Sequence, residues 1–246
     1  MKALLVRIGV DQAYGGWNAP VDPASRRFVY VPIPEADGMR FHPRLERRGQ
    51  EFLPALKRFC AEHGRRSEAD LRFPADLPDC PIHLDPDFNE LTYGDVGARR
   101  GAGMRGMTRG DLLAFYAGLR PIAPCGHRLL YALIGLYVVD EVVPVTAVPR
   151  ERWHQNAHTR RSQRGSSDIV VRAQRGRSGR LERCIPIGEW RGGAYRVTQE
   201  LLDAWGGLSV KDGFIQRSVV PPTMLDPQRF YRWFLRHRIR LMDRNN

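Results

Sequence analysis

The chain has 246 residues and 42% hydrophobic content, which is enough to bury a sizeable core. Its formal net charge of +12 favours a polyanionic partner: nucleic acid, an acidic protein or an anionic surface. Arginine supplies almost all of the positive charge, and it makes forked contacts with phosphate and guanine that lysine cannot make. An arginine-favouring genome explains that bias equally well, but it does not explain the sign of the charge.

The four cysteines are widely scattered and form no Cys-x-x-Cys pair, which argues against a zinc ribbon and against a disulfide scaffold. We therefore expect a reduced, cytoplasmic protein. The apolar run at the N-terminus is too short for a signal peptide or a membrane span, so we expect no membrane partner. Neither a GxGxxG nor a GKS/GKT motif is present, which argues against Rossmann and P-loop folds.

The first part of the chain predicts short strands and one helix. Aliphatic residues 4–10 predict a first strand, and residues 28–34 predict a second, which its prolines place at an edge or end. Apolar residues at helical spacing in 50–62 predict a helix. The prolines of 73–81 predict an extended segment, and the Gly- and Arg-rich residues 98–109 predict a mobile connection.

The middle of the chain predicts the core of the fold. Residues 111–116 predict a strand, and the long apolar, β-branched run 129–143 predicts one bent strand or two strands broken near Gly135. Two such strands form a hairpin of a small barrel. Residues 168–174 predict a further strand, with which residues 181–188 are expected to pair.

Two helices are predicted near the C-terminus. Thr198 caps the first, and Asp226 followed by proline caps the second. The resulting fold class is α+β, a mixed, mostly antiparallel small β-barrel with flanking helices. We predict a single domain over 1–246, with a barrel core at about 81–190, N-terminal strands of 3–34 joining it, and a helical appendage at 198–242.

A cluster of polar and acidic residues between Pro81 and Asp95 is the main candidate for chemistry. Its carboxylates suit a divalent cation such as magnesium or manganese, and its imidazole suits a transition metal. The alternative is a structural or substrate-orienting loop, because Asp-Pro and Tyr-Gly-Asp are common turn sequences. The predicted catalytic residues are His83, Asp85, Asp87, Tyr93 and Asp95.

The spacing of His83-x-Asp85 resembles part of a 2-His-1-carboxylate iron site. Such a site needs a second histidine downstream, for which His154 and His158 are the candidates. A divalent metal is therefore the one cofactor to which the residues point, and its identity stays open.

Aromatic, amide, imidazole and guanidinium groups alternate between Trp153 and Arg161. Such groups stack on bases, bond base edges and hold phosphates. The alternative is a solvated basic loop with its tryptophan in the core. The residues predicted here to bind nucleic acid are Trp153, His154, Asn156, His158, Arg160 and Arg161.

A second predicted pocket combines a carboxylate, aromatic rings and an amide on a glycine-bearing loop, a set that suits a planar ring. The alternative is a tight turn with a packed tryptophan. The residues are Asp11, Tyr14, Trp17 and Asn18, and Tyr116, Lys211, Gln216 and Arg217 complete the predicted nucleic-acid-binding set.

Two family resemblances follow from these segments. The run at 110–119 followed by 133–142 resembles the hairpin of PUA-like domains, small β-barrels that bind RNA or modified bases. Residues 5–16, 28–35, 83–95 and 110–119 together, in that order, resemble the nucleotide modification associated domain family, third type. That resemblance implies a role beside base modification in phage and bacterial DNA and carries over no catalytic residues.

Three functions remain open at this point. The first is a nucleic-acid-binding protein of a DNA-modification or anti-phage defence system that recognises DNA or a modified base. The second is an enzyme that modifies or cleaves DNA with the loop from His83 to Asp95. The third is a structural subunit that docks an acidic partner. We expect DNA rather than RNA as the partner, together with other proteins of such a system.

Overall fold

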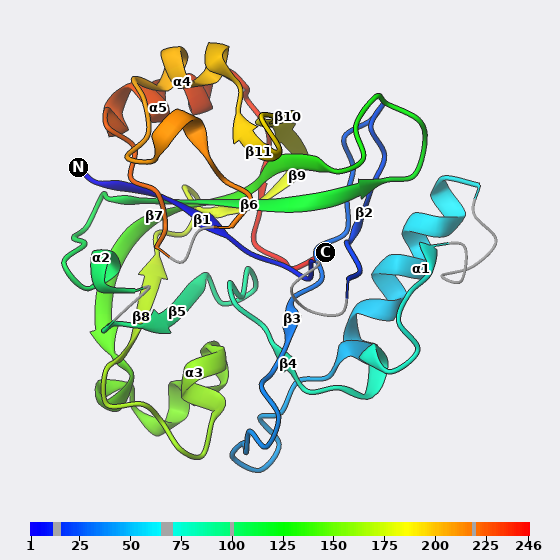
Figure 1. Ribbon diagram of the computed structural model, residues 1–246. Coiled ribbons are helices and arrows are strands. Elements are labelled where there is room, and N and C mark those ends of the chain that lie inside the picture. The colour runs from blue at the N-terminus through cyan, green and yellow to red at the C-terminus, as the bar shows by residue number, and fades with distance from the viewer. Residues whose placement is uncertain (12–15, 65–70, 99–100, 218–219) are drawn as a thin grey trace.

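The hairpin of strands β6 (Leu112–Pro121) and β7 (Leu130–Pro144) runs through the centre of the protein (Figure 1). The computed structural model describes residues 1–11, 16–64, 71–98, 101–217 and 220–246. Both hairpin strands are nearly continuously apolar because both faces of the sheet are covered. The predicted hairpin is confirmed.

Within the described residues, eight strands share one sheet, and most of its pairings are antiparallel. β1 lies parallel to β6, and β7 pairs with β8 on one stretch and with β9 on another. The remaining sheet strands are β1 (Ala3–Arg7), β2 (Pro20–Val21), β5 (Thr92–Val96), β8 (Asp168–Ala173), β9 (Gly179–Pro186) and β12 (Leu241–Met242).

Side chains that alternate along β6 and β7 form two hydrophobic clusters on opposite faces of the sheet. Phe115 and Tyr137 belong to one cluster, whereas Tyr116 and Leu136 belong to the other. The predicted break near Gly135 coincides with register shifts in the pairings of β7. Glycine is required there because a Cβ would lie 2.7 Å from the ring of Phe88.

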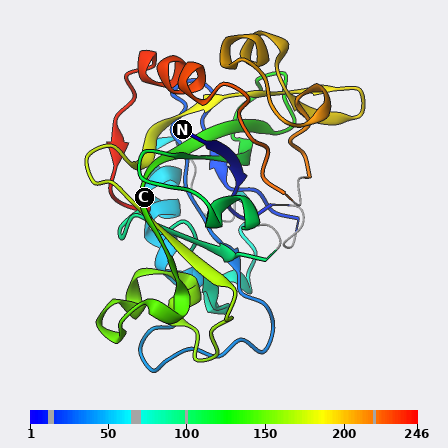
Figure 2. The ribbon, with the colours of Figure 1, turned by 90° about the vertical axis from the view of Figure 1, so that its left-hand side faces the viewer.

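Helices cover the two faces. Helix α1 (Leu53–Glu62) packs its buried side with the first cluster, while α4 (Gln199–Trp205) and α5 (Pro227–Arg236) pack with the second. Thr198 and Asp226 cap α4 and α5 as predicted. Figures 1 and 2 agree that α4 and α5 lie on the opposite side of the molecule from α3 (Ala157–Arg160).

Short elements complete the fold. β3 (Ile33–Pro34) pairs with β4 (Ile82–His83), and β10 (Gly188–Arg191) pairs with β11 (Ala194–Val197). A short helix α2 spans Ala102–Arg105. The 3-10 helices are η1 (Gly49–Phe52), η3 (Leu77–Asp79), η4 (Val145–Ala147), η5 (Arg150–Gln155) and η6 (Lys211–Gly213).

Several sequence-based predictions need correction. The strand predicted at 28–34 shrinks to Ile33–Pro34, since its prolines cannot donate ladder hydrogen bonds. Residues 181–188 do not pair with 168–174 but with β7 and β12. Residues 73–81 contain η3, so the prediction of an extended segment is wrong in part. The predicted mobile connection at 98–109 contains the short helix α2 in its described residues.

The fold class is confirmed as α+β with a mostly antiparallel sheet. Over the residues that the structure describes, the strand pairings follow an open path, so the small closed barrel is not confirmed. None of the helices in this part of the chain has the length and hydrophobicity needed to cross a bilayer.

Candidate metal centre

Three predicted residues from two distant segments lie close together: His83 and Asp85 from the first segment, and His158 from the second. Pairing of β4 with β3 fixes His83 opposite Ile33, and Asp85 follows two residues later. Asn156 accepts a hydrogen bond from the backbone N–H of His158 and thereby caps α3. This cap was not foreseen, and it fixes the His158 ring over β5.

The three side chains present one potential ligand atom each. The Nε2 atoms of His83 and His158 lie 3.7 and 3.8 Å from Oδ2 of Asp85, and one ligand atom from each residue lies within 4.8 Å of the others. Ligands bonded at about 2.1 Å around one ion lie about 3.0 to 3.4 Å apart. To share one ion, the two distances to Asp85 would shorten by about 0.3 to 0.8 Å, and the distance between the two histidine nitrogens, which is within 4.8 Å, by up to about 1.8 Å.

Each histidine has a second carboxylate behind it. Nδ1 of His158 lies 2.7 Å from Oδ2 of Asp168, and Nδ1 of His83 lies 3.0 Å from Oε1 of Glu35. Arg161 donates to Oε2 of Glu35 at 2.7 Å and lies 3.1 Å from His83 Nδ1. Carboxylates in this position fix the tautomer and orientation of metal-bound histidines.

Burial decides the charge of these groups. The Asp85 side chain is 1% exposed, and its burial raises its pKa well above the usual value, against the hydrogen bond from the Gly94 N–H. Burial also lowers the pKa of His83 to about 4, so its imidazole is neutral at neutral pH. Burial opposes the charge of Glu35, but His83 and Arg161 outweigh it and lower the pKa of Glu35 to about 2.

The positions of the ring nitrogens suit a cation. If Nδ1–H of each ring donates to its carboxylate, Glu35 or Asp168, each Nε2 lone pair faces Oδ2 of Asp85. Three electron-pair donors then point at one another inside the protein, an arrangement that a bound cation or a proton on Asp85 would stabilise.

Gly94 lets the centre form. A Cβ at this position would lie 2.5 Å from Oδ1 of Asn156 and 2.6 Å from Cδ2 of His158. Its N–H donates to Oδ2 of Asp85 at 2.7 Å, and Nδ2 of Asn156 lies 3.3 Å from Oδ1. Gly94 belongs to β5, so the interpretation of Tyr-Gly-Asp as a turn is wrong.

The other predicted catalytic residues lie nearby in different roles. Asp87 is buried and accepts from Arg160 at 2.5 Å and from Asn245 at 3.1 Å, which makes it a structural anchor. Tyr93 and Asp95 point to the face of β5 opposite Gly94, and the Tyr93 hydroxyl lies 3.1 Å from Oδ2 of Asp95. They therefore do not share the His83 centre.

The predicted nucleic-acid-binding segment 153–161 has mixed exposure. Trp153 is half-buried, stacks on His42 with ring centroids 4.2 Å apart, and has Arg164 4.2 Å above its ring. His154 is exposed, whereas Arg160 is buried and paired with Asp87. The remaining members, Asn156, His158 and Arg161, belong to the centre described above.

The second predicted pocket is closed by packing where the structure describes it. Trp17 and Asn18 are buried and donate to the carbonyls of Leu71 and Gly118. Asp11 is also buried and forms an ion pair with Arg7. Tyr14 lies outside the described residues.

Four predicted binding residues remain on the other side of the sheet. The Arg7 guanidinium donates to the Gln216 carbonyl, and the buried Tyr116 donates to the carbonyl of Ile215. Arg217 and Lys211 are exposed. The structure thus separates this set from the His83 centre.

Sequence reasoning missed Glu35, Asp168 and Gly94. Glu35 follows a proline-rich strand and Asp168 begins a strand, so neither lies in a recognisable ligand motif. Only their positions in the folded protein identify them, because Glu35 lies beside the imidazole of His83 and Asp168 beside that of His158.

A comparison with family models finds a match that covers these residues. A family model described as nucleotide modification associated domain 3 matches residues 2–205, which include His83, Asp85 and His158. Comparisons with curated proteins and with solved structures found no match. Because the family model covers most of the chain, the protein belongs to the nucleotide modification associated domain 3 family.

Proposed function

We propose that the protein is a metal-dependent enzyme that chemically modifies nucleotides or the bases of nucleic acid. One observation carries the proposal: two imidazole nitrogens and one carboxylate oxygen converge in the interior, each imidazole held by a further carboxylate. His83, Asp85 and His158 would hold the metal. The family to which the chain belongs supplies the association with nucleotides.

Two histidines and one carboxylate leave coordination positions open for substrate, water or dioxygen. This donor set is typical of non-haem iron(II) oxygenases, and zinc enzymes use a similar set to activate water. We favour iron(II) and treat zinc as the alternative. In either case Glu35 and Asp168 would orient the imidazoles, and the buried surroundings would keep bulk water from the reacting atoms.

The substrate class that we propose is nucleic acid or its nucleotides, with DNA ahead of RNA. The net charge of +12 supports a polyanion. Trp17 and Tyr116 are buried, and the ring of Trp153 is already in contact with His42 and Arg164. Because these aromatic rings are not free to stack on a base, we prefer an enzyme over a module that only reads modified bases. Proteins of a modification or defence system remain proposed partners.

Nucleoside analysis of treated DNA tests this function. Purified protein is loaded with iron(II), zinc or manganese and incubated with DNA and with free nucleotides, in air and under argon. The treated DNA is digested to nucleosides, and the masses of the nucleosides and nucleotides are measured by mass spectrometry. We expect a new nucleoside with one metal, and oxygen dependence would distinguish oxidation from hydrolysis.

The variants Asp85→Asn and His127→Gln form the decisive pair. Asp85→Asn keeps the shape and the acceptor for the Gly94 N–H but removes the ligand charge, so product should disappear. His127→Gln alters an exposed imidazole outside the metal centre and should retain product. Equal product from both variants would contradict the proposal.

A further inference from the structure

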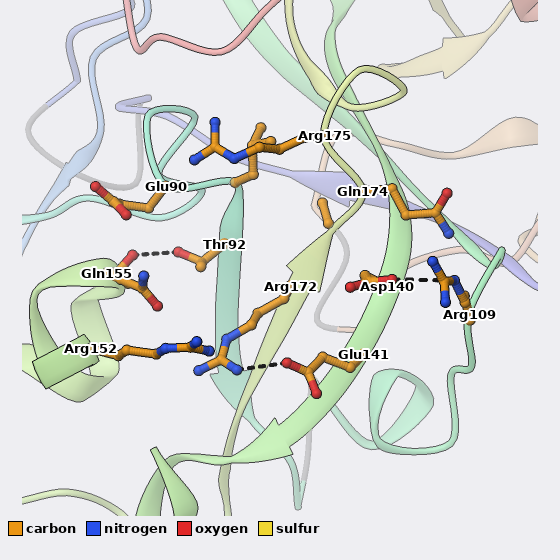
Figure 3. Close-up of a pocket in the computed structure, with 12 residues that line it drawn as sticks. Glu90, Thr92, Arg109, Asp140, Glu141, Arg152, Gln155, Arg172, Gln174 and Arg175 are labelled. Atoms are coloured by element: carbon orange, nitrogen blue, oxygen red, sulfur yellow. Dashed lines mark hydrogen bonds and ion pairs between the residues drawn. The ribbon is translucent and has the colours of Figure 1, made fainter. Parts of the chain in front are cut away.

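A cavity of about 570 Å³ lies next to the metal centre but does not include it. Its volume falls in the range of about 300 to 1,000 Å³ that is usual for small-molecule sites. Figure 3 shows side chains that reach into it from η5, β5, β7 and β8. Its charged lining consists of four arginines and three acidic residues: Arg109, Arg152, Arg172 and Arg175, and Glu90, Asp140 and Glu141.

Among the described residues, the guanidinium group of Arg152 is the one in this cavity without an ion-pair partner. Arg172 forms an ion pair with Glu141 at 2.6 Å, but its Nε is buried without a hydrogen-bond acceptor. Arg152 points toward Arg172 in Figure 3 and forms no ion pair within the described part of the chain. Figure 3 draws Glu141 on the side of Arg172 away from Arg152, so two neighbouring guanidinium groups have one carboxylate partner, which favours a further anion.

The remaining charged groups do not neutralise this pair. Arg109 and Asp140 form their own exposed ion pair at 3.3 Å. Arg175 lies 3.9 Å from Asp243, and both side chains are largely exposed. Glu90 lies 3.9 Å from His154, at the border with η5.

The cavity and the metal centre share one face of the sheet. Thr92 lines the cavity and Gly94 underlies the centre, and residues two apart on a strand face the same side, about 7 Å apart. The Thr92 hydroxyl donates to the carbonyl of Gln155 at 2.5 Å, and Nδ2 of Asn156 lies 3.4 Å from that hydroxyl. Asn156 also contacts Asp85, so it connects Thr92 in the cavity wall to a proposed metal ligand.

We propose that this cavity binds a phosphate group of the substrate, with Arg152 and Arg172 as its ligands. Guanidinium forks match phosphate oxygens in geometry as well as in charge. The amides of Gln155 and Gln174 and the carboxylate of Glu90 line the same cavity and supply hydrogen-bonding groups for the attached sugar or base. This inference rests on the proposed function, because it places the substrate's anionic part beside the metal centre.

Binding of thymidine 5′-monophosphate to the metal-free protein tests the phosphate site without any reaction. The variant Arg152→Gln removes an exposed side chain, so the fold is expected to survive. We expect its dissociation constant to rise about tenfold, which is the usual cost of a lost charge-assisted hydrogen bond. Thymidine without phosphate should bind weakly to wild type and equally weakly to the variant.

Two further variants sharpen the assignment. Arg183→Gln makes the same charge change on β9 at an exposed position outside the cavity, and it should leave binding unchanged. Arg172→Lys keeps a positive charge beside Glu141 but removes the fork, and it should weaken binding as well. Unchanged binding of both the mononucleotide and a DNA oligonucleotide by Arg152→Gln, or equal losses in Arg152→Gln and Arg183→Gln, would overturn the proposal.

A labelled single-stranded oligodeoxynucleotide identifies the source of the phosphate. Removal of one phosphate-binding arginine lowers the slope of log affinity against log salt by about one. If Arg152→Gln changes this slope and spares the mononucleotide, the phosphate is a backbone diester. If it weakens the mononucleotide, the phosphate is a terminal monoester. The metal content of Arg152→Gln after separate loading with iron(II) or zinc distinguishes this result from a failure of the metal centre.

Discussion

The imidazole rings of His83 and His158 lie edge to face, with their centroids 5.1 Å apart and their planes at 74°. His83 belongs to β4 and His158 to α3, and Oδ2 of Asp85 faces the Nε2 atom of each ring. Two imidazoles at this distance would repel if both were protonated, whereas two neutral imidazoles can share a metal. The predictions that follow depend on this relationship.

Asp168 is expected to act as a positioning residue for His158. In Asp168→Asn the amide can still contact Nδ1 at 2.7 Å but no longer carries the charge that makes Nε2 a stronger ligand. Metal affinity, measured by competition with a chelator, should fall by about ten- to a hundredfold. The exposed Asp37→Asn serves as the control and should leave the affinity unchanged. If both variants bind metal like wild type, Asp168 does not support the centre.

Gly94→Ala should distort the centre from beneath. The new methyl group would overlap Asn156 and His158 at 2.5 and 2.6 Å, so these side chains must move. We expect loss of metal binding together with a destabilisation of about 1 to 3 kcal/mol, as for other overpacked sites. Urea unfolding and metal content measure the two effects.

Gly103→Ala is the matched control for Gly94→Ala. Gly103 lies in α2, and its nearest neighbour would be 3.7 Å from the added Cβ. The free energy of unfolding should stay level or rise by about 0.5 to 1 kcal/mol, since alanine is the better helix former. Equal behaviour of the two alanine variants would argue against a sterically fixed centre.

The buried ion pair of Asp87 and Arg160 should contribute strongly to the free energy of unfolding. Arg160→Ala leaves the Asp87 carboxylate in the interior without its guanidinium partner, which costs about 3 to 5 kcal/mol. Denaturant unfolding measures this loss. A weaker DNA affinity in this variant therefore counts as evidence for a contact only when the folded fraction has been measured. An unchanged unfolding midpoint would contradict the structural role of Arg160.

Local sequence patterns predicted the parts of the fold that local physics determines. Proline after Asp226, the cap at Thr198 and the apolar run ending at Val143 each specify one element within a few residues. The pairing of β9 with β7 instead of β8 was not predictable, because strand order depends on contacts between distant segments. Prolines in 28–34 shortened a strand whose side chains are nevertheless buried.

For the candidate site, residue chemistry identified the ligands better than their supports. The spacing of His83 and Asp85, together with a downstream histidine, named the three residues that the structure brings together. The sequence could not choose between His154 and His158, because the choice depends on the Asn156 cap that turns one imidazole inward. The sequence predicts Arg160 as a nucleic-acid-binding residue, since an arginine-rich run does not reveal which member has a buried acidic partner.

The most direct test of the metal centre compares metal content in three proteins: wild type, His158→Gln and His154→Gln. Each is incubated with iron(II) under argon or with zinc, dialysed, and measured for bound metal per chain, with circular dichroism as the check on folding. The account predicts one equivalent in wild type and in His154→Gln, and a loss of bound metal in a folded His158→Gln. Wild-type protein that retains no metal, or a His158→Gln variant that retains as much as wild type, would contradict it.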